Sequence, residues 1–544
     1  MIKKTIKEKL FKNRPTETVA GAALIVSIAG ILSRIFGLFR DRILASQFGA
    51  GDTLDIYYAA FRIPDLIYNL LIVGALSAAF IPVFTGLVSY HKKKEAWKLA
   101  SNILTVQVIS VMIVSIVMII FTPQIMRIIT PGFSDEKMNL TVLLTRIMFL
   151  SPLFLGVSAI FGGILISFKR FLIYAIAPTI YNIGIIVGAL FFAKIFGVAG
   201  LALGVVLGAG MHMLMQYMAV KSIGFHYHIE NIKNIFCDKN IRKIVKLMIP
   251  RSMAMGVNQI NLLVITIFAS TLASGSLAVF NFANNLQSVP LGIFGISFSL
   301  AAFPKLSALA SKNDFDKFRY VFLRTFKRIL FFVIPVSAII FSLRAEIVRV
   351  VLGSGKFDWK DTVDTLWVLG FLSLSLFAQS TIPLLSRAFY ALENTKIPFF
   401  ISLFSEVINI VVVFIVINKF KVLGLAIAFS LSTTVNMFLL FWFLNKEIKF
   451  VFKKELWSPI LKIIIATLFS IIFVYFVRHF LSNFISLKTF GEVLLQLIIS
   501  GSAGVVSFLF FCYFLRVDEF YDFKKSILIR ILGEPKDIIR INDK

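Results

Sequence analysis

The stretch Leu44-Ala-Ser-Gln-Phe-Gly-Ala-Gly51 recurs 224 positions later as Phe268-Ala-Ser-Thr-Leu-Ala-Ser-Gly275. Further matches at offsets of 223 or 224 pair Ala78-Ala-Phe80 with Ala301-Ala-Phe303, Phe133 with Phe357, and Val198-Ala-Gly-Leu-Ala202 with Val422-Leu-Gly-Leu-Ala426. Because these matches share nearly one offset and are spread over most of the chain, they indicate an internal repeat.

The composition around this repeat is that of a membrane protein. Of the 544 residues, 58% are hydrophobic and 15% are charged, whereas a soluble domain has roughly 45–50% apolar and ~25% charged residues. A membrane-spanning helix needs about 20 apolar residues, so the sequence predicts an all-α polytopic protein with about fourteen spans and excludes a soluble enzyme. The predicted spans are 19–44, 54–87, 100–122, 140–168, 172–196, 198–220, 244–273, 276–308, 326–352, 363–391, 396–418, 422–444, 457–480 and 491–516.

Each copy of the repeat contains six predicted spans. An even number gives both copies the same orientation, so we expect two parallel six-helix lobes related by an axis along the membrane normal. Lobes that face each other enclose a central cavity, as in transporters. The predicted organisation is a basic N-terminus (1–18), an N-lobe (19–220), a basic loop (221–243), a C-lobe (244–448), two added spans (449–517) and an amphipathic tail (518–544).

The chain has a net charge of +28, and the distribution of its Lys and Arg residues predicts the orientation. Lys and Arg gather in segments that fall on one side of the predicted spans, whereas the connections 44–53 and 271–276 have almost none. The positive-inside rule therefore predicts that both termini are cytoplasmic, and attraction to anionic lipids accounts for the charge without a nucleic-acid partner. The basic segments are Lys3–Arg14, Lys92–Lys98, Lys221–Lys246, Lys312–Lys327 and Lys446–Lys454.

The first span has more charge than a purely structural helix needs. Gly30, Arg34, Gly37 and Asp41 share one helix face, where small glycines allow close approach. An arginine fork suits a phosphate ligand. The alternatives are that Arg34 pairs internally with Asp41 or Asp55, and that Arg40 and Arg42 extend to the membrane interface.

Polar residues and prolines also interrupt later spans. In the second span Asp55, Arg62 and Asn69 lie on one face and Pro64 breaks the helix, while Pro290 follows a polar run in the eighth span. A proline in a span frees carbonyls that need protein or water partners. We expect a hydrophilic, net cationic cavity that binds phosphate. The seventh span adds Pro250, Arg251 and Asn258.

Glu406 lies near the middle of the eleventh span, with Asn409 one turn away. This pair could hold Na⁺ or a proton; the alternative is a neutral glutamate hydrogen-bonded within its lobe. The sequence has none of the Walker A, HExxH or GxSxG motifs, and its two cysteines form no framework. We therefore expect no enzyme activity, no cofactor and no metal centre, and transport driven by an ion gradient or the membrane potential.

The first-span string Ser33-Arg34-Ile-Phe-Gly37-Leu-Phe-Arg40-Asp41 resembles that of the lipid II flippases, the MurJ/MviN family. This family belongs to the multidrug/oligosaccharidyl-lipid/polysaccharide exporter superfamily. The resemblance implies that Arg34 and Arg40 match essential arginines of the family, Asp41 its paired acid and Asp55 its outer-gate acid. It continues through Phe48-Gly-Ala-Gly51, Phe61-Arg-Ile-Pro64, Gly74-Ala-Leu-Ser-Ala-Ala-Phe80-Ile-Pro82 and Arg387-Ala-Phe-Tyr-Ala-Leu392.

Two positions in the second span and two in the eighth depart from the family pattern. In the second span, Tyr68 and Val73 stand where family members usually carry an arginine and a glutamate. In the eighth span, Asn285 and Ser288 stand where family members again usually carry an arginine and a glutamate. Some members bind sodium in the eleventh span through an Asn and an Asp. Asn409 could match the first, but Val413 stands in place of the second.

The resemblance implies a flippase that moves a polyprenyl-diphosphate saccharide, with lipid II as the expected cargo, to the outer leaflet of the bacterial cytoplasmic membrane by alternating access. We expect it to act as a monomer in contact with membrane lipids. The open alternatives are a flippase for an O-antigen or teichoic-type glycan, and a drug/cation antiporter, which would need acids in the cavity. The expected substrate-binding residues are Ser33, Arg34, Arg40, Arg62, Arg251 and Asn258.

Overall fold

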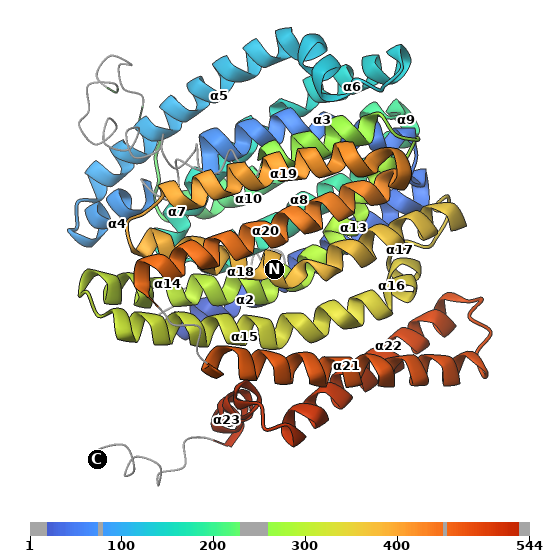
Figure 1. Ribbon diagram of the computed structural model, residues 1–544. Coiled ribbons are helices and arrows are strands. Elements are labelled where there is room, and N and C mark those ends of the chain that lie inside the picture. Colours follow the sequence, from blue (N-terminus) through green and yellow to red (C-terminus); the bar gives the residue numbers. More distant parts are fainter. Residues whose placement is uncertain (1–18, 74–79, 229–234, 236–258, 450–453, 533–544) are drawn as a thin grey trace, which may run out of the picture. The chain divides into compact units, whose positions relative to one another are not determined.

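The computed structural model describes residues 19–73, 80–228, 235, 259–449 and 454–532. All regular elements within these ranges are helices (Figure 1), which confirms the predicted all-α class. Several predicted site residues fall outside the described ranges, together with the basic N-terminus and most of the loop at 221–243. These residues are Pro250, Arg251 and Asn258.

Ten helical segments of the described chain are long and apolar enough to cross a membrane, and a pair bent by 45° would make eleven. The bent pair is α17 (Trp359–Leu374) and α18 (Leu376–Ala391). The three other predicted spans coincide with α2 (Val19–Phe48), with α3 (Asp52–Ile67) and α4 (Ile81–Ser89) together, and with the helix Gln259–Ser270. Every predicted span therefore has a helical counterpart among its described residues, which for 244–273 begin at Gln259.

The internal repeat extends to the helix boundaries. α3 begins at Asp52 and α13 (Ser276–Pro290) begins 224 positions later; α6 (Asp135–Met148) and α17 begin at the same offset. Two short π-helices, η1 (Tyr68–Val73) and η4 (Leu291–Ile296), lie 223 positions apart. The repeat therefore preserves this one helix irregularity as well as the hydrophobic pattern, whereas η3 (Gly188–Phe192) has no counterpart in α19 (Lys396–Phe420).

The chain divides into two compact units, of which the first comprises residues 1–282 and 351–361. In this unit α10 packs against α7 and α8, and α8 packs against α2. The α8–α10 contact is made by glycines: a Cβ at Gly184 would lie 2.2 Å from the Cα of Gly208. The remaining helices of the unit are α5 (Lys93–Ile129), α7 (Leu150–Ser167), α8 (Phe171–Val187), η3 (Gly188–Phe192), α9 (Ala193–Phe196) and α10 (Ala199–Lys221).

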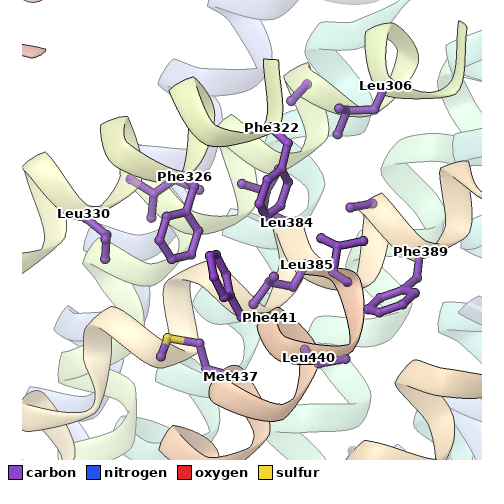
Figure 2. Packing of buried hydrophobic residues seen from close by; sticks show 14 of the residues in the cluster. Leu306, Phe322, Phe326, Leu330, Leu384, Leu385, Phe389, Met437, Leu440 and Phe441 are labelled. Atoms are coloured by element: carbon purple, nitrogen blue, oxygen red, sulfur yellow. The ribbon is translucent and has the colours of Figure 1, made fainter. Parts of the chain in front are cut away.

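The second unit comprises residues 283–350 and 362–544. Its largest apolar core joins α14, α15, α18 and α20, and Phe326 and Phe441 meet there with ring centroids 5.3 Å apart (Figure 2). The helices α21 and α22 pack on each other and on α15. The elements are α14 (Ser297–Ser311), α15 (Phe315–Ser342), α16 (Arg344–Val351), α19 (Lys396–Phe420), α20 (Val422–Ile448), α21 (Lys454–Ser482), α22 (Phe490–Phe514) and α23 (Asp518–Leu532).

Candidate functional site

The arginine-bearing face of α2 adjoins open space in the first unit. Arg34 is half-buried, and a Cβ at Gly30 or Gly37, one turn to either side, would meet no atom within 4 Å. The backbone carbonyl of Ser33 accepts a hydrogen bond of 3.4 Å from the Asn182 amide on α8. This face therefore has a charged group and room for a ligand beside it.

Arg40 is held inside the protein. Its Nε and Nη2 donate to Asp41 Oδ1 at 3.0 and 2.8 Å, and its Nη1 donates to Asn182 Oδ1 at 3.0 Å. Asp41 is only 2% exposed. The charge of Arg40 is thus compensated by the next residue, and Asn182, which the sequence did not single out, fixes its direction.

Arg62 on α3 is buried, and the residues that hold it are neutral. Its Nε donates to Thr266 Oγ1 at 2.7 Å, and its Nη2 donates to Asn281 Oδ1 at 3.0 Å. Both partners belong to the second copy of the repeat. A buried cation held by neutral acceptors retains its charge for a further anionic partner.

Asp55 is 2% exposed and caps the first turn of α13. Its Oδ2 accepts from the backbone N–H of Gly275 at 2.8 Å, and its Oδ1 accepts from that of Ala278 at 2.9 Å. A carboxylate at a helix N-terminus satisfies free N–H groups and complements the helix dipole. We expected an arginine as its ion-pair partner; the structure instead places Lys137 Nζ 3.2 Å from Oδ2.

Lys137 also lies 2.6 Å from the carboxylate of Asp52, at the first residue of α3. Partial burial acts to raise the pKa of Asp52, but hydrogen bonds from Lys137 and Ser274 and the charge of Lys137 lower it overall. Lys137 therefore lies between two acids. Its position in a short polar helix gave no sequence signal for this role.

Further contacts join the two copies of the repeat in symmetric pairs. The Gly132 N–H lies 3.4 Å from Ser270 Oγ, and the Lys356 N–H lies 2.8 Å from the Ser46 carbonyl oxygen. Adding 224 to 132 and to 46 gives 356 and 270, so each contact repeats the other with the copies exchanged. We call the segments 46–55, 130–137, 270–278 and 355–361 the cross-repeat latch; all of them belong to the first unit.

The latch is packed so closely that it needs glycine. Gly275 has φ +88°, and a Cβ there would lie 1.8 Å from the carbonyl oxygen of Ala50. The Ala50 N–H in turn donates to Asp361 Oδ2 at 2.8 Å. Asp361 lies 224 positions after Lys137, so equivalent positions supply opposite charges to the latch.

Pro64 and the residues after it border a cavity in the first unit. Pro64 lies inside α3, four residues before η1, while Pro290 directly precedes η4. The cavity is small, with room for little more than one water molecule. Tyr68, one of the departures from the family pattern, faces it. The lining residues are Phe61, Pro64, Asp65, Tyr68, Met148, Ser151, Pro152, Leu155 and Val205.

Glu406 and Asn409 lie together in the second unit. Both are buried on α19, and Asn409 Nδ2 donates to Glu406 Oε1 at 3.2 Å. In the same unit Ser288 Oγ donates to the Asn285 carbonyl. Within the described ranges, no group of three or more His, Cys, Asp and Glu side chains is placed to hold a metal ion. Ion coupling through Glu406 stays a prediction.

Comparison with known proteins gives consistent results. A family model described as "Lipid II flippase MurJ" matches residues 44–494. A "Probable lipid II flippase MurJ" of Buchnera aphidicola subsp. Schizaphis graminum is 30% identical, with 88% of this chain and 94% of that protein aligned. The corresponding protein of Rickettsia prowazekii is 28% identical over 92% of this chain and 98% of its own length.

The fold has solved relatives. It matches a structure described as "Lipid II flippase MurJ, inward closed conformation" with a TM-score of 0.74 and 28% identity, over 94% of this chain and all of that one. An inward-facing multidrug resistance MATE transporter matches with a TM-score of 0.64 and 16% identity, over 78% of this chain and 98% of its own. The second likeness concerns the fold alone.

Proposed function

We propose that this chain, which belongs to the MurJ family of lipid II flippases, moves lipid II from the cytoplasmic to the outer leaflet of the bacterial cytoplasmic membrane. It is a multi-pass membrane protein. The orientation with both termini in the cytoplasm, supported by the distribution of Lys and Arg, places the cross-repeat latch on the outer side. The chain acts as a monomer surrounded by membrane lipids, and the cargo leaves chemically unchanged.

Arg34, Arg40 and Arg62 bind the diphosphate of the cargo, with Arg251 as a fourth ligand. The observation that carries this assignment is the setting of Arg62, whose buried guanidinium is held by the neutral groups of Thr266 and Asn281. Bidentate donation by arginine matches phosphate oxygens. The open space beside Gly30 and Gly37 admits the headgroup to Arg34.

Closure of the outer side depends on the cross-repeat latch. Asp55 holds the N-terminus of α13, and Asp41 holds Arg40. Release of the cargo outward requires these contacts to open, and their re-formation resets the carrier. The polyprenyl tail remains in the bilayer beside α21 and α22, where α21 exposes Phe473, Tyr475 and Phe476.

Energy for turnover comes from the membrane potential and from an ion bound at Glu406. One unit charge crossing 100 mV is worth ~2.3 kcal/mol, which suffices to bias export of an anionic headgroup from a negative interior. The buried Glu406–Asn409 pair supports an ion-dependent return of the empty carrier.

The decisive experiment is complementation. A bacterium depleted of its own lipid II flippase is expected to grow when it expresses this chain, and to stop growing when the chain carries Arg62→Ala. Failure of the wild-type chain in that strain, together with rescue of a strain that lacks an O-antigen flippase, would assign another lipid-linked glycan. Membrane levels of each variant are measured by immunoblot as the control.

A further inference from the structure

Asp65 is an acid in the interior of the first unit that the proposed function leaves without a role. It is partly buried and lines the same small cavity with Tyr68 and Ser151. Within the described ranges no group donates a hydrogen bond to its carboxylate, and the charge that acts on it is that of Arg62, one turn earlier on α3. An intramembrane acid without donors suits proton uptake and release.

The surroundings of Asp65 favour a proton over a metal cation. Arg62 is positive and acts on the carboxylate, and the other titratable groups that act on this site are the phenols of Tyr57, Tyr68 and Tyr181. A sodium site needs several oxygen ligands and tolerates no adjacent cation, whereas a proton needs only the carboxylate. The cavity supplies a single acid and one adjacent arginine.

Arg62 and Asp65 interact electrostatically, but their side chains contact different groups. Residues three apart in a helix lie on neighbouring positions of its surface. Arg62 donates to Thr266 and Asn281, while Asp65 faces the cavity beside Ser151. The ionised pair has no net charge. Once Asp65 is neutral, the full positive charge of Arg62 acts on any anion bound near it.

We propose that Asp65 is a proton-binding site that controls diphosphate binding at Arg62: a proton taken from water onto the carboxylate strengthens binding, and its loss weakens binding. This inference rests on the proposed function, because it takes Arg62 as a diphosphate ligand. α3 ends two residues after Asp65, at Ile67, and where η1 begins the Tyr68 N–H is shared between the carbonyls of Pro64 and Asp65. The site can therefore adjust locally when its charge changes.

The test measures binding of undecaprenyl diphosphate to the purified full-length chain in detergent at about pH 8 and about pH 6. The wild type is expected to bind at least about fivefold more tightly at the lower pH, in the range of typical coupling between sites. Asp65→Asn, which mimics the protonated acid, is expected to bind tightly at both pH values. Asp65→Glu is expected to retain the pH dependence, and Asp316→Asn, on an exposed part of α15 outside the latch, serves as the control.

Titration of the diphosphate itself affects all four proteins equally, so only the difference between them counts. If Asp65→Asn keeps the wild-type pH dependence, or if sodium rather than pH changes the affinity, the proposal is overturned. Infrared difference spectra between the two pH values provide a readout without substrate. A protonated carboxyl band that disappears in Asp65→Asn supports the proton site even if the chain binds no diphosphate, in which case only the proposed function fails.

Discussion

Two arginines of the first unit differ in the charge of their hydrogen-bond partners. Arg40 donates to the carboxylate of Asp41, so this pair adds little charge to the site. Arg62 has only neutral hydrogen-bond acceptors among the described residues. Burial of a charge costs several kcal/mol unless it is compensated. Arg62 therefore gains most from an anionic ligand, whereas Arg40 contributes mainly by its fixed position beside α8.

Arg34 is the most direct residue-scale test of diphosphate binding. We expect Arg34→Ala to abolish lipid II transport while the protein still inserts at wild-type levels, because the half-buried charge beside Gly30 and Gly37 has room for a ligand. Arg34→Lys should retain partial activity, since an ammonium loses bidentate donation. The readout is lipid II accessibility to an external probe. Arg127→Ala, on the exposed side of α5, is the matched control, and full transport by Arg34→Ala would contradict the assignment.

Asp55 tests the latch at the same scale. Asp55→Ala leaves the amides of Gly275 and Ala278 without their acceptor, which costs about 1–3 kcal/mol for buried polar groups. Hydrogen exchange at these two amides should therefore accelerate by roughly fivefold to 150-fold. Asp52→Ala removes an exposed partner of Lys137 instead and should leave their exchange nearly unchanged. Equal effects of the two substitutions would show that Asp55 does not hold α13.

At the scale of helices, the α8–α10 contact depends on residues without side chains. Gly184 on α8 and Gly188, the first residue of the adjoining η3, face Gly208 and Gly204 on α10. In a bilayer, small residues at four-residue spacing let two helices approach closely. The approach matters for function because α8 also supplies Asn182, which holds Arg40 and the Ser33 carbonyl. Helix packing thus positions the first-span arginines.

Substitution at this contact should destabilise the first unit. A Cβ in Gly204→Ala would lie 2.5 Å from the Gly188 Cα, and overpacking of this kind costs about 1–3 kcal/mol. A lower melting temperature in detergent is the expected result. Gly210→Ala lies on the same helix, where a Cβ meets nothing within 4 Å, so it should melt as the wild type does. If the two variants have similar melting temperatures, the close helix approach at Gly204 does not stabilise the first unit.

The sequence was sufficient for the elements but not for most partners. Hydropathy located a helix at each predicted span, because a bilayer imposes long apolar runs. The π-helices had no local signal, since they depend on how Pro64 and Pro290 fit into their surroundings. The site arginines were visible as costly charges. Their partners Thr266 and Asn182 are common polar residues, and only tertiary packing brings them to Arg62 and Arg40.

For the whole molecule, the repeat accounts for more than the helix order. The first copy supplies Gly132 and Ser46 to the latch, and the second copy supplies the equivalent Lys356 and Ser270. Each copy provides one donor and one acceptor, so separation of the two copies would break both contacts. Opening of the latch under the proposed function would therefore involve both copies.

Parallel orientation of the copies is the remaining prediction at this scale. Glu136 and Lys360 are repeat-equivalent, exposed and located in the first turns of α6 and α17. If both copies start on the cytoplasmic side, Glu136→Cys and Lys360→Cys should both react with an impermeant maleimide in intact cells. Cys237, in the basic loop outside the described residues, should react only after the cells are permeabilised. A six-span repeat with external loops at both positions admits only the parallel arrangement of the copies. Labelling of one engineered position without the other would therefore mean that the copies are inverted. The orientation predicted by the positive-inside rule would then be wrong for one lobe.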